Sequence, residues 1–119
     1  MGRKLTAKQQ AQLGFLELLP PKLDRVHRTI EAMAAMQADE QVVRGMIRVL
    51  EEIKMQAQGL GLGGLSDSAA SMAMLARRSG GGLQFKVRGL RELLAGLKIN
   101  YDGAMKAATT EGGGDDGAP

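Results

Sequence analysis

The chain of 119 residues contains no cysteine and no tryptophan, and its only aromatic residues are Phe15, Phe85 and Tyr101. Without cysteine there are no disulfides, thiolate metal ligands or cysteine nucleophiles. A single histidine, His27, gives no basis for a metal site. No apolar run approaches the roughly 20 residues of a membrane span, and no apolar segment of a signal peptide follows the N-terminus. We therefore expect a soluble, cytoplasmic protein without a cofactor, a metal or a membrane partner.

The charge is mildly basic, with 16 lysines and arginines against 13 acids and a net charge of +3. Six basic residues fall in the last two predicted helices: Arg77, Arg78, Lys86, Arg88, Arg91 and Lys98. They form either a solvated face or a site for an acidic surface. We expect no nucleic-acid partner, because no helix carries a pattern of side chains suited to reading base edges.

Apolar residues recur at intervals of three and four in successive stretches, which is typical of amphipathic helices. Pro20-Pro21 predicts the end of a short helix near Leu19 and the start of another that runs to about Gln37. Asp39 is the expected N-cap of the next helix, which ends near Gln58. Two further helices are predicted over about 62–79 and 85–105, after the glycines of 59–64 and 80–82. Apolar residues assigned to these two helices include Met74 and Phe85.

These stretches predict an all-α protein, an antiparallel four-helix up-down bundle with a short N-terminal helix. We expect one domain over residues 1–108. The segment 109–119 is rich in glycine and aspartate and is expected to be disordered, because it cannot bury enough apolar surface to offset its ordering entropy.

The segment 51–61, Glu-Glu-Ile-Lys-Met-Gln-Ala-Gln-Gly-Leu-Gly, resembles the active helix of histidine phosphotransfer (HPt) domains. In that family a helix carries His-x-x-Lys-Gly, and a Leu-Gly pair follows about two turns after the histidine. Here Lys54 matches the lysine and Leu60-Gly61 match the closing pair. Glu51 stands in place of the phosphoacceptor histidine, and Met55 in place of the small glycine. The resemblance extends over about residues 15–108, including the opening segment 15–20.

The resemblance implies a degenerate HPt domain that keeps a binding surface without the chemistry. A carboxylate at Glu51 accepts hydrogen bonds only and repels a phosphoryl group, and Met55 obstructs the place of the small glycine. We therefore expect no enzymatic activity. The expected role is docking on a response-regulator receiver domain or a histidine kinase in bacterial two-component or chemotaxis-like signalling. The residues expected to contact the partner surround Glu51: Arg48, Glu52, Lys54, Met55 and Gln58.

Two alternatives remain open. The first is a helical scaffold or a self-associating protein, such as a homodimer, that uses the seam of Gly89, Gly96 and Gly103. The second is active phosphotransfer through His27, although this residue lies on another helix and lacks the His-x-x-Lys-Gly pattern, so a structural histidine is expected there. Glu51 and Glu52 are not expected to act as a carboxylate pair, because neighbours on a helix point about 100° apart.

Overall fold

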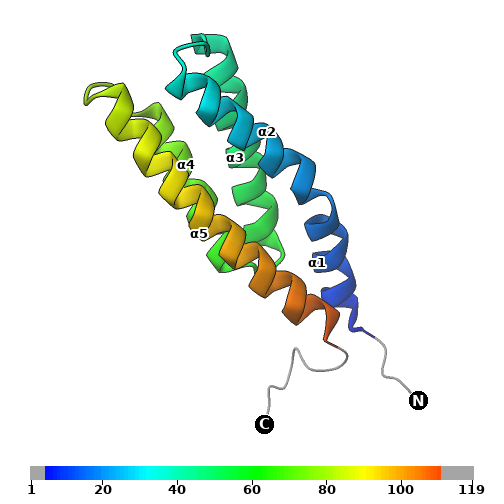
Figure 1. The fold of residues 1–119 in the computed structure, drawn as a ribbon. Helices are drawn as coiled ribbons and strands as arrows, with labels where there is room; N and C mark the ends of the chain where they lie inside the picture. Colours follow the sequence, from blue (N-terminus) through cyan, green and yellow to red (C-terminus); the bar gives the residue numbers. More distant parts are fainter. Residues whose placement is uncertain (1–4, 111–119) are drawn as a thin grey trace.

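The structure is a computed structural model that describes residues 5–110, and within this range it is all-helical, without a strand (Figure 1). Its five helices are α1 (Ala7–Glu17), α2 (Leu19–Ala34), α3 (Glu40–Gly59), α4 (Gly63–Arg77) and α5 (Leu83–Thr109). The predicted helical bundle with a short N-terminal helix is confirmed. Apart from Thr109 and Thr110, the tail predicted at 109–119 lies outside the described residues.

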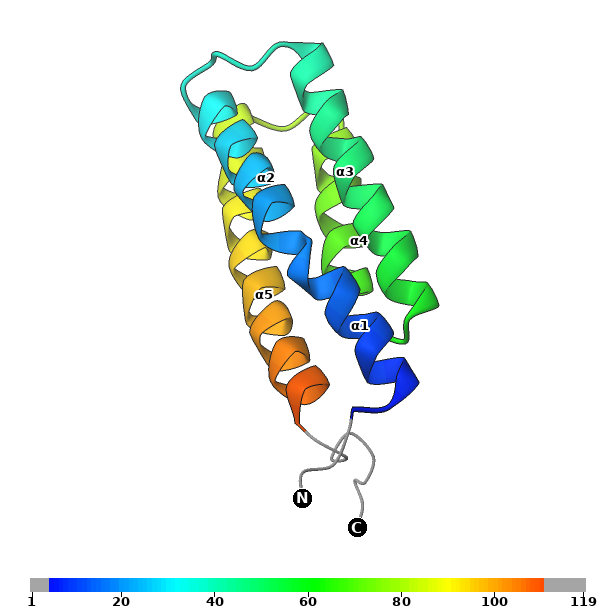
Figure 2. The same cartoon turned by 90° about the vertical axis from the view of Figure 1, so that its right-hand side faces the viewer.

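Helices α1 and α2 follow one another as a bent rod, and α3, α4 and α5 complete the antiparallel bundle. Helices α3 and α4 form one hairpin, and α5 packs against α4, α2 and α1 (Figure 2). The α2–α3 and α4–α5 loops lie at one end of the bundle, and the α3–α4 turn lies at the other.

The break between α1 and α2 has a local cause. Pro20 and Pro21 fall in the first turn of α2, where the missing N–H groups would have no helical partner in any case. Helix α1 begins with a capping box, in which the Gln9 amide N–H donates to Thr6 Oγ1 at 3.0 Å and the Thr6 N–H donates to Gln9 Oε1 at 2.9 Å. The buried Gln9 side chain also donates from Nε2 to the carbonyl oxygens of Ala107 and Thr110, which ties α1 to the end of α5.

The core contains aliphatic residues from all five helices, and its largest fully buried members are Leu16, Leu19, Val26, Ile30, Leu50, Ile53, Leu65, Met72, Val87, Leu90 and Leu97. Within each helix these residues lie three, four or seven positions apart, in agreement with the amphipathic spacing of the sequence. The apolar pattern is wrong for Met74 and Phe85. Their side chains are 69% and 67% exposed and lie outside the core. Met74 follows the buried Met72 by two residues and therefore points about 200° away from it, out of the core.

Helix α2 ends at Ala34, three residues before the predicted end at Gln37. Met36 adopts a left-handed conformation with φ of 58°, and the Gln37 N–H donates to the Ala32 carbonyl at 2.7 Å. This is the hydrogen bond of a Schellman ending, which usually has glycine at the left-handed position. The sequence carries no glycine there, so the earlier end was not predictable from turn residues.

Candidate functional site

The Leu60-Gly61 pair closes α3 by the same kind of ending. Gly61 has φ of 75°, and the Leu62 N–H donates to the Ala57 carbonyl at 2.8 Å. Gln12 of α1 donates from Nε2 to the Leu60 carbonyl at 2.8 Å, which satisfies one of the last acceptors of the helix. The left-handed backbone conformation therefore favours glycine at this position, and the turn directs α4 back along α3.

Helix α4 is fixed against α3 at the level of Lys54. The buried Ser66 donates from Oγ to the Lys54 carbonyl oxygen at 3.1 Å. The Lys54 side chain is partly buried. It is therefore less available to a partner than the sequence analysis expects.

Glu51 lies on the side of α3 that faces α4, and its carboxylate forms an ion pair with the guanidinium of Arg77. The Glu51 side chain is 37% exposed, so it is neither buried nor fully open to solvent. The sequence places Arg77 among the basic residues of the last two helices and gives no indication that it contacts Glu51. The antiparallel α3–α4 hairpin, which brings late α4 residues beside the middle of α3, is the feature that joins them.

Glu52 points about 100° away from Glu51 around α3. Its carboxylate pairs with Lys22 of α2 at 3.5 Å. The two adjacent carboxylates thus contact cations on different helices. This agrees with the prediction that they do not converge on one substrate atom.

The outer surface of α3 and α4 carries two exposed methionines, Met55 at 68% and Met74 at 69%. Met55 lies one turn after Glu51, and Met74 lies one turn before Arg77, so each shares a helix side with one member of the ion pair. Arg48 and Gln58 are also exposed on α3. We call this surface the α3–α4 face and define it by six residues: Arg48, Glu51, Met55, Gln58, Met74 and Arg77.

A hollow of about 330 Å³ continues the α3–α4 face toward the α2–α3 loop, lined by Glu40, Val43, Arg44, Ile47, Ala76 and Arg77. Val43 and Ile47 are partly buried and supply apolar lining. Arg44 and Glu40 form an ion pair across one helical turn at 2.8 Å. The hollow thus combines an apolar floor with a charged rim, the composition that protein-docking surfaces share.

Among the other predicted basic residues, Arg91 of α5 makes a two-point contact with Glu31 of α2. Arg91 Nε donates to Glu31 Oε2 at 2.9 Å, and Nη2 donates to Oε1 at 2.6 Å. These hydrogen bonds lower the pKa of Glu31 and raise the pKa of Arg91. The guanidinium of Arg91 therefore links α5 to α2 and already has an acidic partner.

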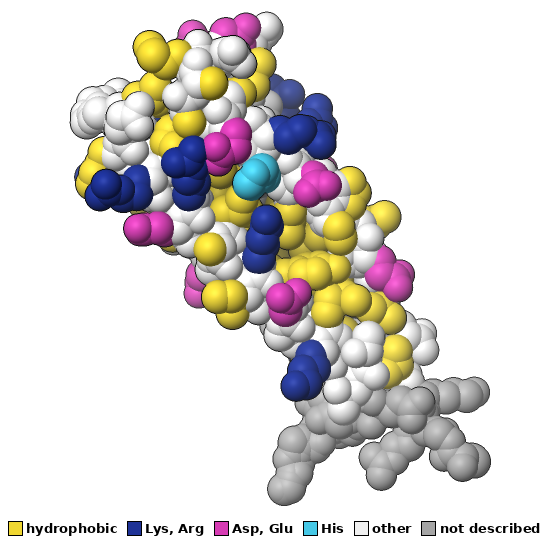
Figure 3. Space-filling view, viewed as in Figure 1, with side chains coloured by type: hydrophobic (Ala, Val, Ile, Leu, Met, Phe, Trp, Pro, Cys, Tyr) yellow, Lys and Arg dark blue, Asp and Glu magenta, His cyan; other side chains and the backbone are white. Residues whose placement is uncertain are grey.

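The residues of the two alternative predictions lie elsewhere. His27, the cyan side chain in Figure 3, is exposed on α2 among charged side chains. At Gly89 an added Cβ would lie 2.6 Å from Leu75 Cδ2, so this glycine lets α4 approach α5 within one chain. At Gly96 and Gly103 an added Cβ would meet nothing within 4 Å. The three glycines therefore do not form one continuous contact seam within the chain.

Within residues 5–110 no group of three histidine or acidic side chains is placed to hold a metal ion. No helix in this range is long and apolar enough to cross a membrane. Comparisons of the chain with protein-family models, with curated proteins and with solved structures found no match.

Proposed function

We propose that this chain is a non-catalytic binding module of the HPt type. It would dock through the α3–α4 face on a response-regulator receiver domain, or on a histidine kinase, without accepting phosphate. The setting is bacterial two-component or chemotaxis-like signalling in the cytoplasm. Docking would compete with a true phosphotransfer protein or hold the regulator in a complex.

One observation carries this proposal: in the HPt-like segment of α3, Met55 and Gln58 are exposed, Glu51 is partly exposed on the same side, and the helix ends at a turn with a left-handed glycine. Glu51 and Met55 share one side of the helix, and Gly61 has the left-handed φ that restricts other residues. A motif placed in the core would have offered no surface to a partner.

The side chains on this face favour binding over phosphotransfer. A carboxylate at residue 51 has no lone-pair nitrogen to attack an aspartyl phosphate, and its ion pair with Arg77 already occupies it. Met55 is long, flexible and 68% exposed. Exposed methionines suit adaptable protein interfaces, because an unbranched thioether side chain packs against varied shapes.

The test is calorimetric titration of the full chain against a panel of receiver domains from the source organism. We expect saturable binding to one or two receivers. Met55→Asp places a charge in the centre of the interface and should weaken that binding at least about tenfold. Lys54→Glu should weaken it less, because the lysine is partly buried.

The matched control is Ile99→Asp, which introduces the same charge at a 71% exposed apolar position on α5. This variant should bind receivers as the parent chain does. Failure of every receiver and kinase domain to bind would contradict the proposal. Equal losses in Met55→Asp and Ile99→Asp would also contradict it, because they would show that the α3–α4 face is not the specific contact.

A second candidate function is self-association through α5. Ile99 is exposed between Gly96 and Gly103, and these three positions lie on one side of the helix, where small residues would allow another helix to approach closely. Sedimentation equilibrium tests it. A dimer that Ile99→Asp dissociates, together with no receiver binding, would favour this second function over the first.

A further inference from the structure

The stretch 68–91, which includes the adjoining ends of α4 and α5, carries charge of one sign. Between Asp67 and Glu92 the sequence contains no acidic residue and five basic ones: Arg77, Arg78, Lys86, Arg88 and Arg91. Such a concentration of like charge attracts acidic groups. Most of these cations lie near the loop at 80–82, which joins the two helices at one end of the bundle.

Two of the five cations have partners within the bundle. Arg77 pairs with Glu51, and Arg91 pairs with Glu31. The other three, Arg78, Lys86 and Arg88, form no ion pair with any residue in the described range 5–110. Three cations without an ion-pair partner among residues 5–110 therefore lie in or near the α4–α5 loop.

An exposed aromatic ring stands among these cations. Phe85 is 67% exposed in the first turn of α5, and Arg88 lies three residues later on the same side of the helix. Phe85 borders a pocket of about 310 Å³ whose lining includes Leu75, Arg78 and Lys86. It also borders a second hollow of about 440 Å³ that includes Arg88. Phe85 therefore lines both hollows, and the second is also lined by Gln84, Arg91 and Glu92.

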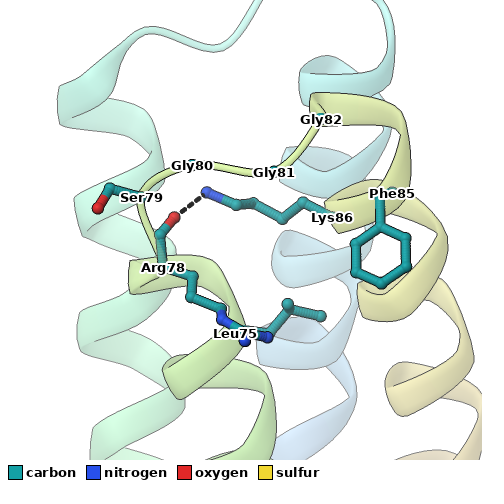
Figure 4. A pocket seen from close by; sticks show the side chains of 8 residues that line it. All are labelled: Leu75, Arg78, Ser79, Gly80, Gly81, Gly82, Phe85 and Lys86. Carbon is teal, nitrogen blue, oxygen red and sulfur yellow. Dashed lines mark hydrogen bonds between the residues drawn. The ribbon is translucent and has the colours of Figure 1, made fainter.

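The first pocket has a defined wall. Gly80 and Gly81 both have positive φ, 83° and 72°, which turns the loop tightly over the pocket. Lys86 reaches across the loop and donates from Nζ to the Arg78 carbonyl oxygen, and the Phe85 ring points away from this hydrogen bond (Figure 4). The Lys86 ammonium keeps two further N–H donors for another acceptor.

We propose that this loop end is a docking site for an acidic peptide segment of a protein partner. An apolar side chain of the segment packs on Phe85, and flanking carboxylates reach Arg78, Lys86 and Arg88. We call these four residues the loop-end site. The site does not depend on docking of a receiver at the α3–α4 face, because it uses none of the residues that define that face.

Two other anionic partners fit the surface less well. A membrane of anionic lipids would meet Asp39 and Glu40, which lie at the same end of the bundle on the α2–α3 loop and the start of α3. Single-stranded nucleic acid is usually bound by stacking successive bases on several aromatic rings. The loop-end site offers one ring.

The experiment is fluorescence anisotropy of the full chain with a labelled peptide that has one central leucine flanked by glutamates. We expect saturable binding that Phe85→Ala and Arg88→Glu each weaken about tenfold. The matched controls lie on the same helix: Ile99→Ala removes an equally exposed apolar side chain, and Lys98→Glu makes the same charge reversal. Both controls should change the affinity less than about twofold.

Several outcomes would overturn the proposal. One is the absence of saturable binding. Another is an equal loss in Lys98→Glu and Arg88→Glu, which would indicate attraction by net charge alone. Tighter binding of phosphatidylserine vesicles, or of single-stranded DNA, than of the peptide would reassign the site to that partner. Met55→Asp should leave peptide binding unchanged, so failure at this site and failure at the α3–α4 face are separable.

Discussion

Arg77 of α4 forms an ion pair with Glu51 of α3, the residue that the HPt resemblance sets in the phosphoacceptor's place. A phosphoryl group carries a charge of about −1.5 to −2, whereas a carboxylate carries one charge, and here a neighbouring cation offsets it. The pair therefore disfavours the idea that Glu51 imitates a phosphorylated histidine. The ion pair links the two helices of the α3–α4 face.

The Glu51–Arg77 pair should contribute little to stability, because both side chains are more than one third exposed. A double-mutant cycle with Glu51→Gln and Arg77→Gln should give a coupling free energy of about 0.2–1 kcal/mol. Urea unfolding of the four chains measures it, and added salt should reduce it. A coupling well above this range would mean that the pair is a principal contact between α3 and α4.

Gly89 and Gly96 lie one heptad apart in α5 and should respond differently to alanine. Gly96→Ala should raise the free energy of unfolding by about 1 kcal/mol, because helix propensity improves and an added Cβ would meet nothing within 4 Å. In Gly89→Ala the Cβ would lie 2.6 Å from Leu75 Cδ2, so Leu75 must leave its rotamer, at a cost of about 1 kcal/mol. Thermal unfolding that shows equal stabilisation would contradict the close α4–α5 approach at Gly89.

Helices α2 and α3 both end with a residue in the left-handed conformation, Met36 and Gly61. Substitutions at these two residues should change the stability in opposite directions. Met36→Gly should stabilise the chain by about 1 kcal/mol, since glycine adopts φ of 58° without the steric cost that methionine bears. Gly61→Ala should destabilise it by about 1–2 kcal/mol for the converse reason. Chemical denaturation measures both. Gly59→Ala is the control, because Gly59 lies in the helix and should gain from alanine.

The Glu31–Arg91 contact predicts a dependence of stability on pH. The Arg91 hydrogen bonds hold the pKa of Glu31 below its ordinary value of 4.5. A carboxyl with a lowered folded-state pKa stabilises the fold above its unfolded-state pKa, and that contribution is lost as the pH falls through the lowered pKa. The parent chain should therefore be more stable than Glu31→Gln at neutral pH, and the difference should vanish in acid. Melting temperatures of both chains, measured from neutral pH down through the lowered pKa of Glu31, give this difference in stability.

The control for the pH experiment is Glu92→Gln. Glu92 is an exposed carboxyl of α5 that pairs with no cation among residues 5–110. Its replacement should leave the melting temperature nearly unchanged at every pH. A loss in Glu31→Gln that persists unchanged in acid would show that the contact does not act through ionisation of Glu31.

The sequence was sufficient for the fold because helical periodicity and turn residues agree along the chain. Pro20-Pro21, Asp39 and Gly61 each mark a helix boundary for a local steric or hydrogen-bonding reason, and the structure places the boundaries within a few residues of them. The end of α2 was misplaced because Met36 takes a conformation that its residue type does not signal.

The candidate site was predictable only in part. Spacing on one helix was enough to place Met55 and Gln58 on an exposed surface. The contact of Glu51 with Arg77 depends on the relative register of two helices, which periodicity does not define. The exposure of Met74 and Phe85 has a different cause: an apolar residue type does not by itself indicate an inward position.

The most direct test of the central proposal is to rebuild the missing motif with Glu51→His and Met55→Gly in one chain. If α3 is a degenerate HPt helix that still docks on a receiver, the folded double variant should take phosphate from a radiolabelled phospho-receiver, whereas the parent chain should not. Adding His27→Gln to the double variant should not reduce the phosphate transfer that the variant has gained. A double variant with native helical circular dichroism that takes phosphate from no receiver in the panel would contradict the account.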